Sequence, residues 1–273
     1  MVVLSCLARK GGVGKSTSVR CLSVECLKAG LSVVIIDTDP QLTCLRWGQR
    51  RAKLGIPVPL VVAVSPAGIA DQIASFRKQR VEVILIDTPP TATPVVNAAL
   101  DVSDAALVIT RPNPEDLESV QESLRVAGAQ KRRTGVILWQ SPPDKRVRAV
   151  TLAREALEAM GARVCPTAIS ASISYPYAYA DGLTPQEREP EGRARAELAE
   201  VWAWLQREGI MAATSYDTVA TAPTGRKATV PKGHKVFRSG DPMADVPRGH
   251  KVTTPLDKRA KRPAGHTTRR GLV

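Results

Sequence analysis

The sequence predicts a doubly wound α/β fold, in which helices cover both faces of a mostly parallel sheet. Segments with strand character alternate with segments of helical character along residues 1–208. The strand segments are continuous apolar runs rather than alternating ones, which is typical of strands buried on both faces. A glycine-rich loop at residues 10–14 separates the first strand from the first helix. Ligands of such sheets bind beyond the carboxyl ends of the strands.

Each element follows from its own residues. The helix beginning near Ser16 is expected to end before Gly30, a common C-terminal stop. Pro114 suits the first position of a helix, with acidic residues in its first turn. The expected strands are residues 2–7, 33–36, 58–64, 81–86, 105–110, 136–140 and 163–169. The expected helices, besides the one at Pro114, are residues 16–29, 42–54, 66–80, 146–160 and 187–208.

The loop has the composition of a phosphate-binding loop. It reads Lys10-Gly11-Gly12-Val13-Gly14-Lys15-Ser16-Thr17 and lies between a strand and a helix. Glycines let backbone N–H groups approach a phosphate, and the helix start adds unpaired N–H groups. Lys15 is expected to reach the β- and γ-phosphates, and the Ser16 hydroxyl to bind Mg²⁺. The alternative is a chance glycine-rich turn.

Three aspartates are expected at the same edge of the sheet as this loop. Asp87 ends the apolar strand 83–86 and suits the Walker B carboxylate that orients Mg²⁺. Asp37 and Asp39 follow the strand at 33–36. Parallel strands bring these ends together, so one site is predicted. Two alternatives stay open: Asp87 as an ordinary strand end before a proline turn, and Asp37 as a cap of the next helix.

The loop departs from the strict P-loop pattern, because Arg9 stands at its first glycine position and Lys10 lies inside it. This arrangement resembles the deviant P-loop of the ParA/MinD ATPases, over roughly residues 1–205. The resemblance implies that Lys10 crosses a dimer interface and touches the nucleotide of the other subunit. It also implies that Asp39 positions the attacking water, and that Asp37 supports the metal or its network.

The resemblance extends to the rest of the nucleotide site. Thr17 is expected to donate a hydrogen bond to the α-phosphate. Where relatives often carry an asparagine that recognises adenine, this sequence has Trp139-Gln140, so Gln140 is a candidate for contact with the base. The implied catalytic residues are Lys10, Lys15 and Asp39. The implied ligands of Mg²⁺ are Ser16 and Asp87. The implied ATP-binding residues are Gly11, Gly12, Val13, Gly14, Lys15, Ser16, Thr17, Asp37 and Gln140.

The function implied is that of a small ParA-like ATPase for DNA partition or cargo positioning. Such a protein forms a homodimer with ATP, binds DNA nonspecifically, and hydrolyses ATP when a centromere-binding or adaptor protein stimulates it. We expect it in the cytoplasm, on the nucleoid when ATP is bound. A MinD-like membrane-surface ATPase is disfavoured, because Glu197, Glu200 and Glu208 are expected on the polar face of the last helix. A nucleotide-switched regulator or scaffold in plasmid transfer remains open.

Composition adds three expectations. The five cysteines form no C-x-x-C pair, which favours buried free thiols in a reducing compartment. No run reaches the 18 or so apolar residues that a membrane span needs, and no signal peptide is evident. The basic charge is uneven, since residues 207–273 hold 14 basic and 5 acidic side chains, +9 of the total +13.

Residues 209–273 are expected to be a separate, disordered basic tail of low complexity. A Pro-x-Gly-His element recurs in it every 16 residues, at 231–234, 247–250 and 263–266. Three copies at one spacing indicate duplication of a short binding element. We expect multivalent contact with DNA or an acidic partner. A metal site and an inert extension are the alternatives.

Overall fold

The computed structural model describes residues 1–90, 93–143 and 148–211. Within these ranges seven strands form one sheet in the order β3-β2-β4-β1-β5-β6-β7, and every neighbouring pair is parallel. The strands are β1 (Val2–Leu7), β2 (Val33–Asp37), β3 (Leu60–Ala63), β4 (Val83–Asp87), β5 (Ala105–Thr110), β6 (Arg133–Leu138) and β7 (Arg163–Val164). The doubly wound parallel sheet predicted from the apolar runs is confirmed.

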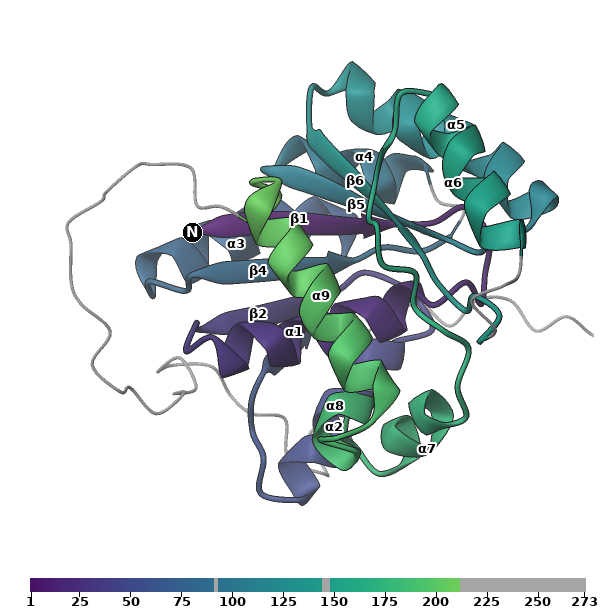
Figure 1. Cartoon of the computed structure of the whole chain (residues 1–273). Helices are drawn as coiled ribbons and strands as arrows, with labels where there is room; N and C mark the ends of the chain where they lie inside the picture. Colours follow the sequence, from purple (N-terminus) through teal and green to yellow (C-terminus); the bar gives the residue numbers. More distant parts are fainter. Residues whose placement is uncertain (91–92, 144–147, 212–273) are drawn as a thin grey trace, which may run out of the picture. The chain divides into compact units, whose positions relative to one another are not determined.

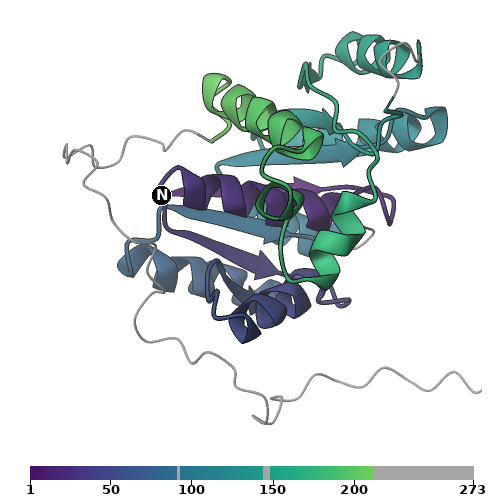
Figure 2. The same cartoon turned by 60° about the horizontal axis from the view of Figure 1, so that its bottom comes forward.

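Helices cover both faces of this sheet (Figure 1). They are α1 (Lys15–Lys28), α2 (Thr43–Lys53), α3 (Ile69–Lys78), α4 (Thr93–Asp101), α5 (Pro114–Ala129), α6 (Arg148–Ala159), α7 (Ser174–Ala180), α8 (Pro185–Arg188) and α9 (Arg193–Arg207), with a 3₁₀ turn at η1 (Pro66–Gly68). One apolar core joins α1, α2 and α9 to the sheet. A second joins α3 and α4 to it, and a third joins α4, α5 and α6 to it. Helices α1 and α9 lie side by side (Figure 2).

The strands are buried because both sheet faces are covered. Every residue of β1, β2, β4 and β5 is buried. Helix α5 begins as expected, since Pro114 is at its first turn and the Asn113 side chain accepts a hydrogen bond from the Asp116 N–H at 2.9 Å. The five cysteines are free and buried, as predicted. No helix in the described part of the chain is long and apolar enough to cross a membrane.

Several element boundaries differ from the prediction. The expected helix at 187–208 is two helices, because Pro190 and Gly192 interrupt it between α8 and α9. The expected strand at 163–169 is only two residues long, and Pro166, which has no N–H for the ladder, follows closely. Strand β6 ends at Leu138, so Trp139 and Gln140 lie beyond it. Helices α4 and α7 have no counterpart among the expected helices, although the ParA/MinD resemblance placed a helix end near 177–183.

The C-terminal helix differs from the expectation in two further respects. Glu197 is not on a solvent-facing polar stripe: it is 9% exposed and accepts hydrogen bonds from Ser170 at 2.9 Å and 2.6 Å. After α9, Ile210 and Met211 are also buried in the core, so the packed part continues past residue 208. The three Pro-x-Gly-His repeats lie outside the described residues.

Candidate functional site

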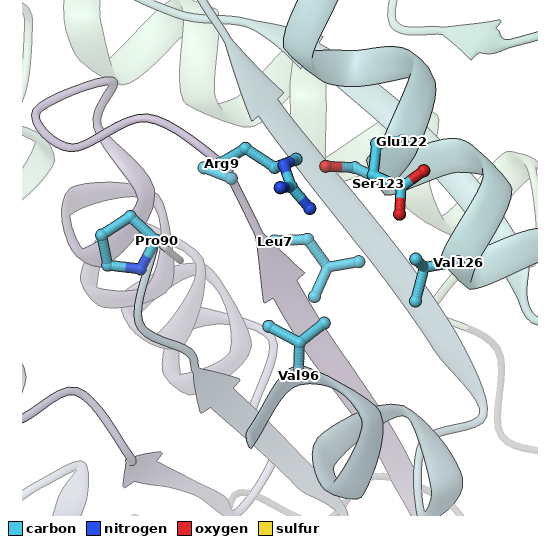
Figure 3. Close-up of a pocket in the computed structure, with 8 residues that line it drawn as sticks. Leu7, Arg9, Pro90, Val96, Glu122, Ser123 and Val126 are labelled. Carbon is cyan, nitrogen blue, oxygen red and sulfur yellow. The ribbon is translucent and has the colours of Figure 1, made fainter. Parts of the chain in front are cut away.

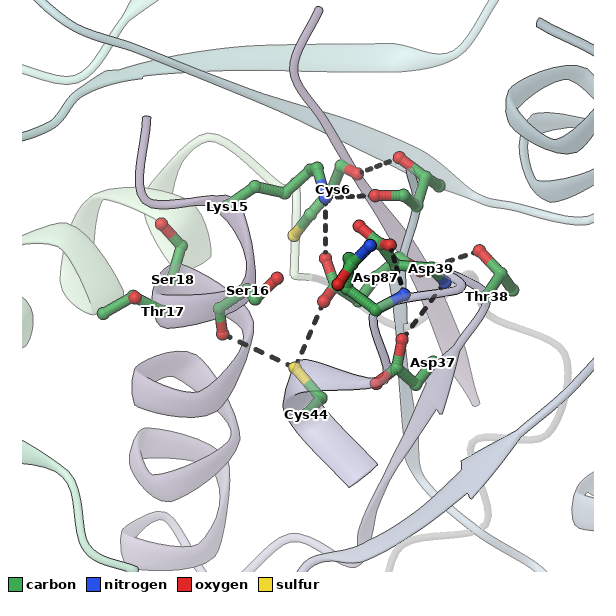
Figure 4. Close-up of polar contacts among 12 residues, drawn as sticks. Cys6, Lys15, Ser16, Thr17, Ser18, Asp37, Thr38, Asp39, Cys44 and Asp87 are labelled. Atoms are coloured by element: carbon green, nitrogen blue, oxygen red, sulfur yellow. Dashed lines mark hydrogen bonds and ion pairs between the residues drawn. The ribbon is translucent and has the colours of Figure 1, made fainter. Parts of the chain in front are cut away.

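The glycine loop and the three aspartates lie together at the carboxyl edge of the sheet (Figure 4). Strands β2 and β4 pair in register, so that Asp37 is the direct neighbour of Asp87 at their ends. Strand β1 pairs on the other side of β4, where Cys6 is the partner of Asp87. Parallel pairing therefore produces the single site that the separate motifs predicted.

The glycine loop leaves the start of α1 open to an anion. Gly12 and Gly14 have φ values of 76° and 103°, in the region that favours glycine. Gly14 is the N-cap residue of α1, whose start has no side-chain cap and no acidic residue in its first turn. The first N–H groups of the helix are thus free of an internal carboxylate, which suits a phosphate.

The tryptophan after β6 packs against the glycine loop. Trp139 is 1% exposed, and a Cβ added at Gly14 would lie 2.3 Å from its Cδ1 atom. No side chain fits at residue 14 without moving the indole. Trp139 is therefore a packing residue of the phosphate loop, a role that the sequence reasoning did not assign.

The lysine at the end of the loop is held by the Walker B aspartate. Lys15 Nζ lies 3.0 Å from Asp87 Oδ1 and also donates to the Thr88 carbonyl oxygen. Lys15 is 7% exposed and Asp87 is fully buried. Burial lowers the pKa of Lys15, but the charge and hydrogen bond of Asp87 outweigh it and raise that pKa overall. The ammonium is therefore kept charged inside the site.

The two aspartates after β2 hold the turn into α2. Asp37 accepts hydrogen bonds from the N–H groups of Asp39 at 3.1 Å and Leu45 at 3.0 Å. The second bond caps the first turn of α2, which is the capping role left open for Asp37. Asp39 in turn accepts from the Gln41 N–H at 2.9 Å. Burial, and then the charge of Asp87, raise the pKa of Asp37 to about 6.

A thiol also belongs to this site. Cys44 Sγ lies 3.2 Å from Asp87 Oδ2 and 3.5 Å from the Ser16 carbonyl oxygen. Burial, and then the charge of Asp87, raise the pKa of Cys44 well above its usual range, so the thiol donates to the carboxylate. No pattern around Cys44 pointed to this contact, since it is a lone cysteine in the first turn of a helix.

The donors at this edge fit a hard divalent cation. Carboxylate oxygens of Asp37 and Asp87 lie within 4.8 Å of each other and of Cys44 Sγ. The Ser16 hydroxyl makes no hydrogen bond to any described residue. Hydroxyl and carboxylate oxygens are the ligands that Mg²⁺ prefers. Ser16 and Asp87 can therefore hold Mg²⁺ once Asp87 exchanges its internal partners.

The extra lysine of the loop contacts acidic residues at the start of α5, not the aspartates that follow β2 and β4. Lys10 Nζ lies 3.1 Å from Asp116 Oδ1 and 3.4 Å from Glu115 Oε2, at the start of α5. Asp116 is also paired with Arg111. The Lys10 side chain remains 36% exposed, so it is accessible from outside the site.

A cavity of about 410 Å³ opens next to the loop. It is lined by Thr17, Trp139, Gln140, Tyr175 and Pro176, among others. Its volume lies within the range of roughly 300–1,000 Å³ that is typical of small-molecule sites. The Gln140 amide Nε2 donates to the Gly12 carbonyl oxygen at 3.0 Å, so this predicted residue touches both the loop and the cavity.

A second cavity lies between the end of β1 and helices α4 and α5, beside Leu7, Arg9, Val96 and Glu122 (Figure 3). It holds about 30 Å³. That is the share of roughly one water molecule in the liquid, so a nucleotide does not fit there.

The fold and the site together define a P-loop nucleotide-binding domain of the ParA/MinD type. Three features meet at the carboxyl edge of a parallel sheet: a phosphate loop with an inserted lysine, a Walker B aspartate, and the aspartates Asp37 and Asp39 after β2. The chain belongs to the family of CobQ/CobB/MinD/ParA nucleotide binding domains, which matches residues 4–185.

One relative in sequence and several solved structures of the same fold are similar to this chain. Protein ParA of Rhizobium radiobacter is 26% identical over 133 residues, which are 48% of this chain and 58% of that protein. The chain thus spans little more than half the length of this curated relative. Among solved structures, apo McdA of Cyanthece superposes with a TM-score of 0.62 and 16% identity, covering 75% of this chain and 99% of that one. MinD of Pyrococcus horikoshii, complexed with Mg-ADP, gives a TM-score of 0.59 and 19% identity, covering 78% and 99%.

Proposed function

We propose that the protein is a ParA-like ATPase that binds Mg-ATP, dimerises with it, and hydrolyses it to ADP and phosphate. The observation that carries this proposal is the meeting of Lys15, Ser16, Asp39 and Asp87 beside a helix start that has no internal anion. Phosphoryl transfer needs positioning and charge neutralisation more than covalent chemistry, and these groups provide both.

Each residue has a separate task in this reaction. The N–H groups of residues 11–16 cradle the phosphates, and Lys15 moves from Asp87 to the β- and γ-phosphate oxygens. Ser16 and Asp87 would hold Mg²⁺, which supplies further positive charge at the phosphates. Asp39 orients the attacking water, whose oxygen bonds to the γ-phosphorus as the bond to ADP breaks. The cavity beside Thr17 and Gln140 takes the nucleoside.

Lys10 connects nucleotide binding to dimerisation. Its partners in one chain are the exposed Glu115 and the buried Asp116. A nucleotide held by a second subunit would offer it phosphate oxygens in exchange. The partly exposed position of Lys10 supports this role, because the side chain can leave α5 without unfolding any element.

Nonspecific DNA binding and a stimulating partner complete the proposal. The formal charge of +13 favours contact with a polyanion, and ATP-dependent dimerisation would double the number of basic side chains per particle. A membrane-anchoring role for α9 has less support, because Leu198, Val201 and Leu205 are buried in the core rather than available to lipid.

The test is ATP turnover and particle mass in Mg-ATP, measured by phosphate release and by light scattering after size exclusion. We expect Lys15→Ala to abolish turnover. Asp39→Ala should dimerise yet hydrolyse at least tenfold more slowly, whereas Asp71→Ala, at an exposed position of α3, should behave as wild type. Full activity of the Asp39 variant would place the water-orienting group elsewhere.

The dimer requires a separate comparison. Lys10→Ala should bind ATP but remain monomeric. Its matched control is Lys28→Ala at the end of α1, which removes an exposed lysine whose ion-pair partner, Glu25, lies in the same helix. Normal dimerisation of the Lys10 variant would contradict the role of this lysine.

A further inference from the structure

An arginine in the second turn of α1 contacts the phosphate loop, and the proposed mechanism does not use it. Arg20 is 6% exposed, although it carries a charge. Its Nε atom donates to the Ser16 carbonyl oxygen at 3.1 Å, and its Nη2 atom donates to Thr17 Oγ1 at 2.9 Å. The guanidinium is thus bound to the two residues that directly follow Lys15.

The bond to Thr17 determines what that hydroxyl can offer a ligand. A threonine hydroxyl has one proton and two lone pairs, and Arg20 occupies one lone pair. No acceptor within the described residues takes the proton, whereas the neighbouring Ser18 gives its proton to the Gly14 carbonyl oxygen at 2.9 Å. Thr17 lines the 410 Å³ cavity. A phosphate oxygen, which only accepts hydrogen bonds, matches the donor that Thr17 retains.

The arginine is held in place from the opposite side. Its guanidinium lies 4.4 Å from the ring centroid of Tyr179 in α7, and Arg50 of α2 lies at the same distance from that ring. Stacking of this kind fixes a guanidinium without using its N–H groups. The Arg20 Nη1 atom is buried without a hydrogen bond to any described residue. A buried unpaired donor costs free energy, so the contacts that Arg20 makes with Ser16, Thr17 and Tyr179 must outweigh that cost.

We infer that Arg20 is a positioning residue of the nucleotide site, which orients the Thr17 hydroxyl toward the α-phosphate. The inference rests on the proposed nucleotide function. It predicts that Arg20 matters for every nucleotide that has an α-phosphate and not for the nucleoside alone. A merely structural arginine would affect all of these ligands equally.

The experiment measures competition of ATP, AMP and adenosine against a fluorescent ATP analogue, with full-length protein. Arg20→Met should raise the Kd of ATP and of AMP roughly tenfold, the loss expected when one hydrogen bond to the phosphate is weakened. The Kd of adenosine should change less than about twofold. The matched control is Arg50→Met, which removes the stacking partner on the same ring but no contact to the phosphate loop.

A double-variant cycle with Thr17→Val tests the route of the effect. In that background Arg20→Met should weaken ATP binding by less than about twofold, because the hydroxyl it positions is gone. Additive losses, or an adenosine Kd that rises as much as that of AMP, would overturn the inference and leave the proposed function standing. Wild-type protein that binds no ATP would overturn both.

Folding is checked by circular dichroism. If Arg20→Met does not fold, Arg20→Lys replaces it, because lysine keeps the charge but cannot hold Ser16 and Thr17 at once. The same expectations and the same contrary results then apply to it.

Discussion

Removing the charge of Lys15 should destabilise the nucleotide-free protein, independently of any effect on catalysis. Lys15 and Asp87 are 7% and 0% exposed, and their charged atoms are 3.0 Å apart. Breaking a buried pair by deleting one partner costs about 3–5 kcal/mol, since the other charge is left without compensation. For a domain of this size each kcal/mol corresponds to about 2–4 °C. Lys15→Met should therefore lower Tm by roughly 6–20 °C.

The assay is thermal unfolding by circular dichroism, without nucleotide or Mg²⁺. Lys15→Met/Asp87→Asn should recover most of the loss, because in the double variant Asp87 is no longer a buried charge that has lost its partner. The control is Arg125→Met, which breaks the pair with Glu122 on α5, whose side chains are 68% and 39% exposed. Exposed pairs contribute about 0–1 kcal/mol, so its Tm should stay within about 4 °C of wild type.

Two results would refute this reasoning. One is a Lys15→Met variant as stable as Arg125→Met. The other is a double variant no more stable than Lys15→Met alone. Either would mean that the Lys15–Asp87 pair does not hold the empty site together.

Three further predictions concern the loop, Asp37 and the tail. Gly14→Ala should cost about 1–3 kcal/mol and shift tryptophan fluorescence, because its Cβ meets Trp139 at 2.3 Å, whereas Gly11→Ala has open space and should not. The pKa of Asp37 in the folded protein, about 6, lies above the ordinary value of 3.8, so ionisation of Asp37 should destabilise the fold. This destabilisation should grow from about pH 4 to pH 6 and stay constant above pH 6. The Tm of Asp37→Asn minus that of wild type should therefore rise with pH over this window, and a difference that does not change with pH would contradict the prediction. Deleting residues 212–273 spares the buried Met211 and should leave ATP hydrolysis intact. It should weaken DNA binding and make the affinity depend less steeply on salt concentration, since 13 basic side chains are lost. An unchanged dependence on salt would favour a protein partner for the tail.

The sequence by itself determined the fold class and the main residues of the site. Continuous apolar runs such as β4 report burial on both faces, which depends on local composition and needs no knowledge of neighbours. Once the strands are parallel, their ends share one edge, so the meeting of Lys15, Asp37 and Asp87 also followed from the sequence.

The tertiary structure alone decided which side chains touch. Cys44 and Trp139 carried no recognisable pattern, because their contacts join segments far apart in the chain. Arg20 reaches Ser16 and Thr17 within its own helix, but the ring of Tyr179, about 160 residues away, stacks on its guanidinium. The same holds for Glu197. The helical pattern predicted that it faces solvent, but it is buried and accepts two hydrogen bonds from Ser170. Periodicity gives the face of a residue on its own element. What covers that face depends on loops such as 165–173, whose path is set by long-range packing rather than by local preference.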